Sequence, residues 1–158
     1  MESPACQDHV VEIHGLTRRF GAKRALDNVH LTLPAGAVLG LVGRNGAGKT
    51  TLIKHVLGLL KPQSGSVRVF GQEPARDSPG VLSRIGYLSE DADLPAWMRV
   101  GELMRYARAF YPTWDPDYAE ELRREFGLDA SAPIRTLSKG QRARAGLLVA
   151  LAYRPELL

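Results

Sequence analysis

The sequence predicts an α/β fold, and three adjoining features carry this prediction. Residues 43–50 read Gly-Arg-Asn-Gly-Ala-Gly-Lys-Thr and match the pattern G-x-x-x-x-G-K-[ST] at every fixed position. An apolar run over residues 37–42 precedes the motif, and apolar residues at helical spacing over 51–60 follow it. A glycine-rich turn between a buried strand and a helix presents backbone N–H groups and partial positive charge to phosphate oxygens. We therefore expect a phosphate-binding loop, called the phosphate loop below, at residues 43–50.

Two side chains of the phosphate loop suit a nucleoside triphosphate. The ammonium group of Lys49 can reach the terminal phosphates, and the hydroxyl of Thr50 is suited to ligate Mg²⁺. The competing interpretation is a strand, turn and helix whose glycines serve packing alone. Because the fixed positions and both flanks agree, we favour a nucleotide site.

The first part of the chain is expected to form mainly strands. Alternation of apolar and polar residues, or a short apolar run bounded by turn residues, indicates each of them. Turns that contain both proline and glycine are expected at residues 34–36 and 61–65. The expected strands are residues 10–16, 25–33, 37–42, 66–70 and 85–88.

From about residue 94 onward the pattern becomes helical. Apolar residues recur every three or four positions, and the proline-containing stretch 111–117 interrupts them. Gly127 is a plausible residue to end a helix, since glycine accepts a left-handed backbone at that position. The expected helices are residues 100–110, 118–126 and 138–153, and residues 156–158 resemble the opening of another strand.

Composition narrows the class of protein. The chain has 158 residues, of which 44% are hydrophobic and 24% charged, as in globular proteins. Its longest apolar runs fall far short of the roughly 18 residues that a membrane span needs. The single Cys6 excludes an internal disulfide, and the N-terminus lacks the layout of a signal peptide, so we expect a cytoplasmic protein. The net charge of +4 is spread along the chain, and no nucleic acid partner is expected.

A second motif opens the last expected helix. Residues 137–141 read Leu-Ser-Lys-Gly-Gln, which places Ser138 where a helix N-cap is expected. A hydroxyl and free N–H groups at a helix start can face an anion, and Gly140 permits close approach of a backbone or ligand. Taken alone, the motif is better explained by an ordinary capped helix.

Together the two motifs resemble the nucleotide-binding domain of ATP-binding cassette (ABC) proteins. The resemblance implies a P-loop NTPase with a RecA-like core, an N-terminal antiparallel β-subdomain and an α-helical subdomain, incomplete at the C-terminus. It implies a β-rich and phosphate-loop core at 1–93, a helical subdomain at 94–153, and the start of the Walker B strand at 154–158. The residues implied to bind ATP are Phe20, Gly43, Arg44, Asn45, Gly46, Ala47, Gly48, Lys49, Thr50 and Thr51.

In this family two domains pair head to tail around two ATP molecules. The resemblance therefore implies a homodimer or heterodimer, Mg²⁺, and an integral-membrane permease that holds the subunit at the inner face of the membrane. The family's signature sequence, which faces the nucleotide of the partner domain, corresponds to Leu137, Ser138, Lys139, Gly140 and Gln141. Lys139 replaces a frequent glycine, and we expect little harm because a side chain is tolerated in the first turn of a helix. The tracts around Trp97 and Trp114 resemble bacterial export-type subunits, and both tryptophans are expected to fill the core or an interface.

Two further positions follow from the resemblance. Phe20 falls where the family places an aromatic residue that stacks on adenine, and the alternative is a buried phenylalanine of a hairpin. Glu90 falls where the family has a glutamine near Mg²⁺ and the attacking water; a carboxylate is a good ligand for a hard cation. The alternative for Glu90 is a loop residue that interacts only with solvent, beside Asp91 and Asp93.

No catalytic residue is identified in the sequence. The family's Walker B Asp, its catalytic Glu and a later His would follow Leu158, and all four histidines lie before the signature. We interpret these histidines as surface or hairpin residues. We expect a truncated chain that binds ATP and hydrolyses it weakly or not at all, because losing a general base alone removes about 10²–10⁴ in rate. The alternative is a non-catalytic, regulatory fragment that pairs with an intact cassette.

Overall fold

The computed structural model describes residues 9–89 and 94–158. The chain divides into an N-terminal unit, Met1–Leu82, and a C-terminal unit, Ser83–Leu158. Each unit has its own fold and is described by itself.

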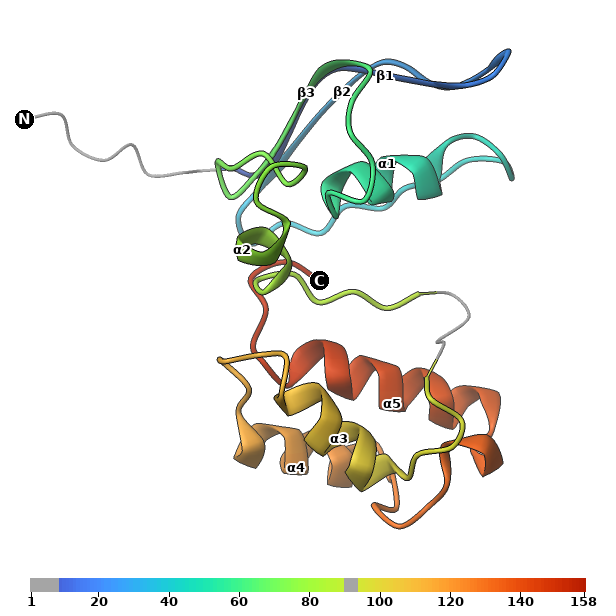
Figure 1. Ribbon diagram of the computed structural model, residues 1–158, viewed down its shortest axis with the longest axis vertical. Coiled ribbons are helices and arrows are strands. Elements are labelled where there is room, and N and C mark those ends of the chain that lie inside the picture. Colours follow the sequence, from blue (N-terminus) through green and yellow to red (C-terminus); the bar gives the residue numbers. More distant parts are fainter. Residues whose placement is uncertain (1–8, 90–93) are drawn as a thin grey trace, which may run out of the picture. The chain divides into compact units, whose positions relative to one another are not determined.

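The N-terminal unit is built on an antiparallel sheet of three strands (Figure 1). β1 (His9–Phe20) lies in the middle, between β2 (Lys23–Pro34) and β3 (Ser64–Val69). A two-residue turn joins β1 to β2, so that Phe20 pairs with Lys23 at the end of the hairpin. The first two expected strands are confirmed, and each is longer than the sequence pattern indicated.

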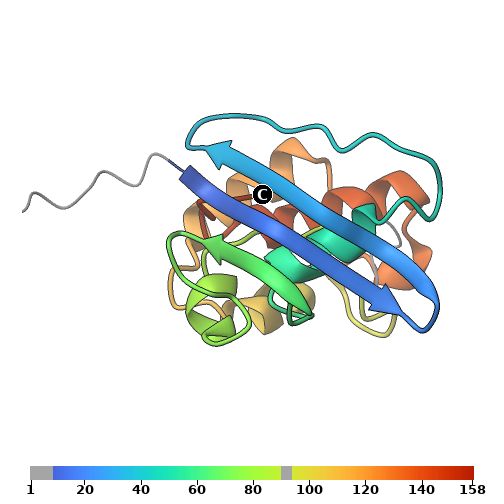
Figure 2. The same cartoon turned by 90° about the horizontal axis from the view of Figure 1, so that it is seen from above.

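Helix α1 (Lys49–Val56) lies on one face of this sheet and contacts β2 and β3 (Figure 2). The apolar side chains of the unit meet between the two layers, which is how a half-buried sheet and an amphipathic helix remove apolar area from water. The buried residues include Val11, Ile13, Leu16, Leu26, Leu52, Leu57, Val67 and Val69. A short helix, α2 (Ser78–Leu82), ends the unit. The packed layers hold the start of α1 and the end of the β1–β2 hairpin in fixed positions.

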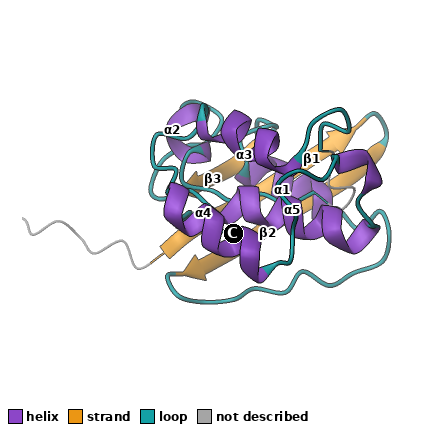
Figure 3. Ribbon diagram, turned by 90° about the horizontal axis from the view of Figure 1, so that it is seen from below, coloured by secondary structure: helices purple, strands orange, loops and turns teal. Residues whose placement is uncertain are grey.

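The expected strand at residues 37–42 is wrong. This segment runs as an extended loop from β2 to α1 (Figures 2 and 3), and the side chains of Val38 and Val42 are fully exposed. A strand needs a neighbour that accepts and donates its backbone hydrogen bonds. Within the described residues of this unit, no other segment lies in register with 37–42.

The C-terminal unit is a cluster of helices. α3 (Val100–Arg108), α4 (Pro116–Glu125) and α5 (Lys139–Leu151) match the three expected helices within a few residues, and a 3₁₀ turn η1 spans Ile134–Thr136. Gly127 has a positive φ of 62° and ends α4, as expected. The apolar core includes Met98, Val100, Leu103, Trp114, Ala119, Leu122, Ile134, Leu148 and Tyr153.

The two tryptophans of this unit differ. Trp114 belongs to the core, as expected. Trp97 is 79% exposed and fills no space in the core of the C-terminal unit. Helical spacing cannot separate the two cases, because both tryptophans lie in turn-rich segments outside the helices.

The beginning and the end of the C-terminal unit lie together. Ile85 and Leu157 form a parallel β-bridge, and the Gly86 N–H donates to the Leu157 carbonyl at 2.7 Å. The hydroxyl of Tyr153, just after α5, donates to the Ile85 carbonyl at 2.5 Å. The strands expected at 85–88 and 156–158 are thus reduced to one bridge. Burial raises the pKa of the Tyr153 hydroxyl, with a smaller effect of the stacked Tyr111 ring.

Candidate functional site

The phosphate loop joins the extended segment after β2 to the start of α1. Gly46 and Gly48 have φ values of 80° and 96°, in the left-handed region that favours glycine. Gly48 also lies tightly against β2: a Cβ on it would come within 2.3 Å of the Ala25 carbonyl oxygen. The motif's second fixed glycine is therefore required both by its backbone conformation and by its contact with the sheet.

The N-terminus of α1 has no side-chain cap. Among the hydrogen bonds of the described ranges, none occupies the backbone N–H groups of Gly48, Lys49 and Thr50. The first turn also carries no acidic residue, so the positive end of the helix dipole is not neutralised within the helix. These N–H groups can donate to an anion.

The ammonium group of Lys49 is folded back onto the phosphate loop. Its Nζ donates to the Gly43 carbonyl at 2.7 Å and to the Arg44 carbonyl at 3.2 Å. Both are hydrogen bonds of a cation to neutral oxygens. A phosphate oxygen is a stronger acceptor for an ammonium group than a carbonyl, so this position suits a cation that turns to a bound polyphosphate.

The residues present fit a magnesium ion that arrives with a nucleotide. The hydroxyl of Thr50, the second residue of α1, is a hard oxygen ligand beside the N–H groups just described. The described residues contain no cluster of three or more His, Cys, Asp or Glu side chains that could hold a metal ion. Thr50 would therefore share the ion with phosphate oxygens and water, as Mg²⁺ commonly does. Glu90, the other expected ligand, lies outside the described residues.

Phe20 ends β1 and is 47% exposed, which excludes the alternative of a buried hairpin residue. The guanidinium group of Arg18 lies over the ring, 4.9 Å from its centroid. Across the hairpin, the Lys23 ammonium lies 3.4 Å from the position that a Cβ on Gly46 would occupy. The end of the β1–β2 hairpin thus lies beside the phosphate loop, and the exposed ring of Phe20 is available to stack.

The sequence did not place Arg18 or Lys23 near the phosphate loop. The signal in the sequence was a pair of cations on either side of Phe20 in a two-residue hairpin. Their positions depend on the register of β1 with β2 and on how the phosphate loop packs against β2, neither of which can be read from local spacing.

The signature sequence starts α5 with a complete cap. The Ser138 hydroxyl accepts a hydrogen bond from the Gln141 N–H at 3.2 Å, and the Gln141 side chain accepts one from the Ser138 N–H at 2.9 Å. Lys139 is the first residue of the helix, as the sequence predicts. A Cβ on Gly140 would meet no atom within 4 Å, so the space beside this backbone is open. The signature residues lie in the C-terminal unit, whereas the phosphate loop lies in the N-terminal unit.

The interpretation of the four histidines as surface or hairpin residues is wrong for His55. This residue is 1% exposed in α1, and its Nδ1–H donates to the Thr51 carbonyl at 2.8 Å. His55 lies at helical spacing on the apolar face of α1, and this spacing is the signal that could have placed it in the core. His55 supports the helix that carries the phosphate loop and does not face solvent.

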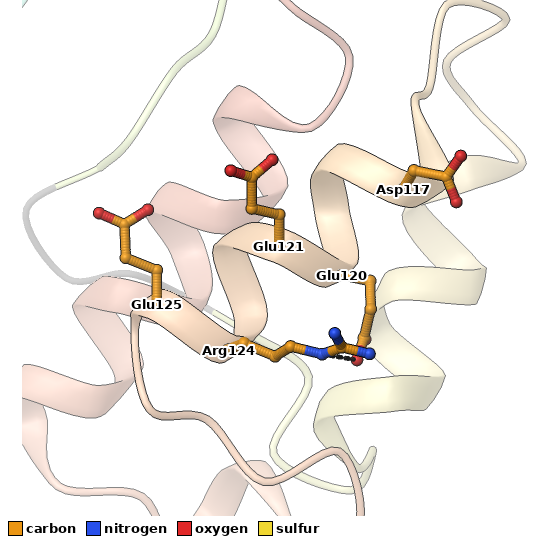
Figure 4. A pocket seen from close by; sticks show the side chains of 5 residues that line it. All are labelled: Asp117, Glu120, Glu121, Arg124 and Glu125. Carbon is orange, nitrogen blue, oxygen red and sulfur yellow. Dashed lines mark hydrogen bonds and ion pairs between the residues drawn. The ribbon is translucent and has the colours of Figure 1, made fainter.

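The structure also has a hollow on α4, and the residues that line it belong neither to the phosphate loop nor to the signature sequence. It is lined by Asp117, Glu120, Glu121, Arg124 and Glu125, all on one helix (Figure 4). Hydrogen bonds from Arg123 and Arg124 lower the pKa of Glu120 to about 2. The hollow is therefore a charged, solvated helix face on which Glu120 is ion-paired with Arg123 and Arg124 of the same helix.

Comparison with known proteins agrees with this geometry. A solved structure titled as the ATP binding subunit of an ABC transporter superposes with a TM-score of 0.83 at 28% identity, over 92% of this chain and 63% of that chain. The ribose import ATP-binding protein RbsA of Pseudomonas putida is 39% identical over 160 residues, 94% of this chain and 31% of RbsA. The daunorubicin resistance ATP-binding protein DrrA3 of Streptomyces coeruleorubidus is 34% identical over 164 residues, 96% of this chain and 49% of DrrA3.

The fold is that of a P-loop NTPase, of which the chain contains an antiparallel sheet and the helices described above. The sequence model of the family described as ABC transporter matches residues 26–158. The chain therefore belongs to the ABC transporter family, and it spans 31% and 49% of the length of the two curated relatives above. No helix within the described ranges is long and apolar enough to cross a bilayer.

Proposed function

We propose that the chain is the ATP-binding part of an ABC transporter subunit and that it binds ATP with Mg²⁺ at the phosphate loop. The observation that carries the proposal is the open N-terminus of α1. Its first N–H groups have no partner within the described residues, and a lysine side chain lies beside them on carbonyl oxygens. Both features favour a ligand with several negative oxygens.

Binding requires a small rearrangement within the phosphate loop. Lys49 exchanges the carbonyls of Gly43 and Arg44 for phosphate oxygens, and the N–H groups of the first helical turn donate to the same ligand. Bound Mg²⁺ would neutralise phosphate charge and orient the terminal phosphates, with the Thr50 hydroxyl as its protein ligand. The exposed Phe20 ring would stack on the base.

The signature sequence would act on the nucleotide of a second cassette. We propose pairing of two such domains, each presenting Ser138 and the start of α5 to the partner's ATP, and attachment to a membrane permease. This arrangement rests on the family resemblance and on the open space beside Gly140. Export is the proposed direction, because residues 94–115 resemble export-type subunits. Transport assays in membrane vesicles with an assembled permease would distinguish export from import.

We further propose that the 158-residue polypeptide retains ATP with little turnover. The site described above supplies binding groups from the phosphate loop and α1, and no side chain in it is placed as a general base. The alternative role, a regulatory chain that pairs with an intact cassette, would show as reduced ATPase activity when the two are mixed.

Calorimetric titration of the purified chain with ATP and Mg²⁺ tests the proposed binding. The expected result is saturable binding that Lys49→Ala weakens by at least tenfold, since a charge-assisted contact to phosphate is lost. Lys54→Ala, which removes an exposed lysine further along α1, serves as the control and should bind normally. Equal binding by the wild-type chain and Lys49→Ala would contradict the proposal.

A further inference from the structure

The end of the β1–β2 hairpin places a second lysine against the phosphate loop. Lys23 is exposed, and its ammonium group lies 3.4 Å from where a Cβ on Gly46 would stand. Within the described ranges, the ammonium group of Lys23 has no hydrogen-bonded or ion-paired partner. Its partner in the hairpin register is Phe20, the residue expected to stack on the base.

The local charge at this hairpin is strongly positive. Arg18, Arg19, Lys23 and Arg24 lie within two paired strand ends, and Arg19 stands directly opposite Arg24. Like charges in directly opposite positions of an antiparallel pair destabilise it. Asp27 forms an ion pair with Arg24, and Arg18 donates to the Lys61 carbonyl at 3.2 Å. A polyanion bound beside the hairpin would relieve the remaining repulsion.

We propose that Lys23 is a second cation of the nucleotide site and contacts the phosphate chain of a bound nucleoside diphosphate or triphosphate. This inference rests on the proposed function. Lys49 would serve the phosphate chain from the start of α1, and Lys23 would serve it from the hairpin, on the Gly46 side of the loop. The hairpin would thereby hold both ends of the ligand: Phe20 binds the base and Lys23 binds the phosphate chain.

The position of Gly46 explains why a lysine suits this place. The glycine has no side chain, so the ammonium group can lie close to the loop backbone, where the phosphates would bind. The long, flexible stem of lysine lets its charge follow the ligand without a change in the sheet.

Titration of the full chain with ATP and Mg²⁺ tests the inference with three variants of Lys23 and two reference variants, Arg68→Ala and Lys49→Ala. Lys23→Ala is expected to weaken binding by about tenfold and to make the affinity less dependent on salt, because one cation–phosphate contact is lost. Lys23→Arg should bind within about threefold of wild type, because the charge is kept. Lys23→Gln, which keeps the length of the side chain, should bind like Lys23→Ala, and melting temperatures should be unchanged.

Arg68→Ala is the matched control. It also removes one exposed cation from the sheet, but Arg68 pairs with Glu12, eight residues along β1 from Phe20. It should bind ATP within about twofold of wild type. The inference is overturned if Lys23→Ala and Lys23→Gln bind as tightly as Arg68→Ala, while Lys49→Ala still loses affinity; the proposed function then stands. If the wild-type chain binds no ATP, both the proposed function and the inference fail.

Discussion

Helices α1 and α5 begin with similar residues but differ in how their N-termini are capped. Each starts with a lysine as its first residue, Lys49 or Lys139, and neither has an acidic residue in its first turn. α3 and α4, in contrast, carry Glu102 and Asp117 there. Acidic residues stabilise this position through the helix dipole, and lysine does the opposite.

The difference between α1 and α5 lies in the cap. At α5, Ser138 and Gln141 satisfy each other's backbone N–H groups, so the helix start is stable without a ligand. At α1, the residue before the helix is a glycine and no side chain replaces the cap. The start of α1 therefore leaves N–H groups free to donate to water or to an anion, whereas the start of α5 satisfies its own through Ser138 and Gln141.

The largest effect is expected when a methyl group is added to Gly48, the glycine that precedes α1. Gly48→Ala should destabilise the N-terminal unit by about 2–4 kcal/mol and abolish ATP binding, because the new Cβ meets the Ala25 carbonyl and the backbone is left-handed. Gly140→Ala is the matched change at α5 and meets no atom. It should leave stability unchanged or raise it by about 0.5 kcal/mol. Urea unfolding and ATP titration measure both; equal effects of the two substitutions would break the comparison.

The far end of α5 provides the next test. Tyr153→Phe should cost about 1–3 kcal/mol, because the Ile85 carbonyl loses its donor. Burial raises the pKa of Tyr153 above its unfolded value, so the stabilisation is complete below about pH 10 and is lost as pH rises through the folded pKa. Denaturation from pH 7 to 12 should show a loss of stability in alkali that is smaller in Tyr153→Phe. Parallel curves for the two proteins would argue against this role of the hydroxyl.

Removing the cap of α5 should have a smaller effect. Ser138→Ala is expected to cost about 1 kcal/mol, which is typical for an N-cap. Amide hydrogen exchange in the first turns of α5 should become faster. ATP binding by the isolated chain should not change, since the signature residues lie outside the phosphate-loop unit; a large loss of affinity would contradict the account.

The smallest effect concerns the charge at the start of α5. Lys139→Glu should stabilise the helix by about 0.3–1 kcal/mol, as the carboxylate interacts favourably with the helix dipole. Thermal unfolding at low and high salt measures this gain, which should shrink as salt is added. A loss of stability would show that Lys139 has a structural partner.

The sequence predicted those parts of the fold whose signal is local. The phosphate loop, the three long helices and the β1–β2 hairpin follow from motif and periodicity over neighbouring residues. The prediction of a strand at residues 37–42 was wrong because an apolar run indicates that a segment can be buried, but it does not indicate that a partner strand is present. His55 was misassigned for a related reason, since burial depends on packing against distant segments; the exposure of Trp97 leaves an interface as its remaining expected place.

The candidate site likewise contains residues that the sequence could predict and residues that it could not. Lys49 and Thr50 are fixed by the motif itself. The placement of Phe20, Arg18 and Lys23 depends on the register of the hairpin and on the contact between Gly48 and Ala25, and these are tertiary features. A single sequence contains the residues of such a contact without showing that they meet.

The most direct test of the comparison is an NMR titration of the isolated, monomeric chain with ATP and Mg²⁺, in which backbone amide shifts are recorded. Large, saturable shifts are expected for the amides of residues 46–51 at the start of α1, and little change for residues 138–142 at the start of α5. Shifts at the start of α5 with none at the start of α1 would contradict the comparison.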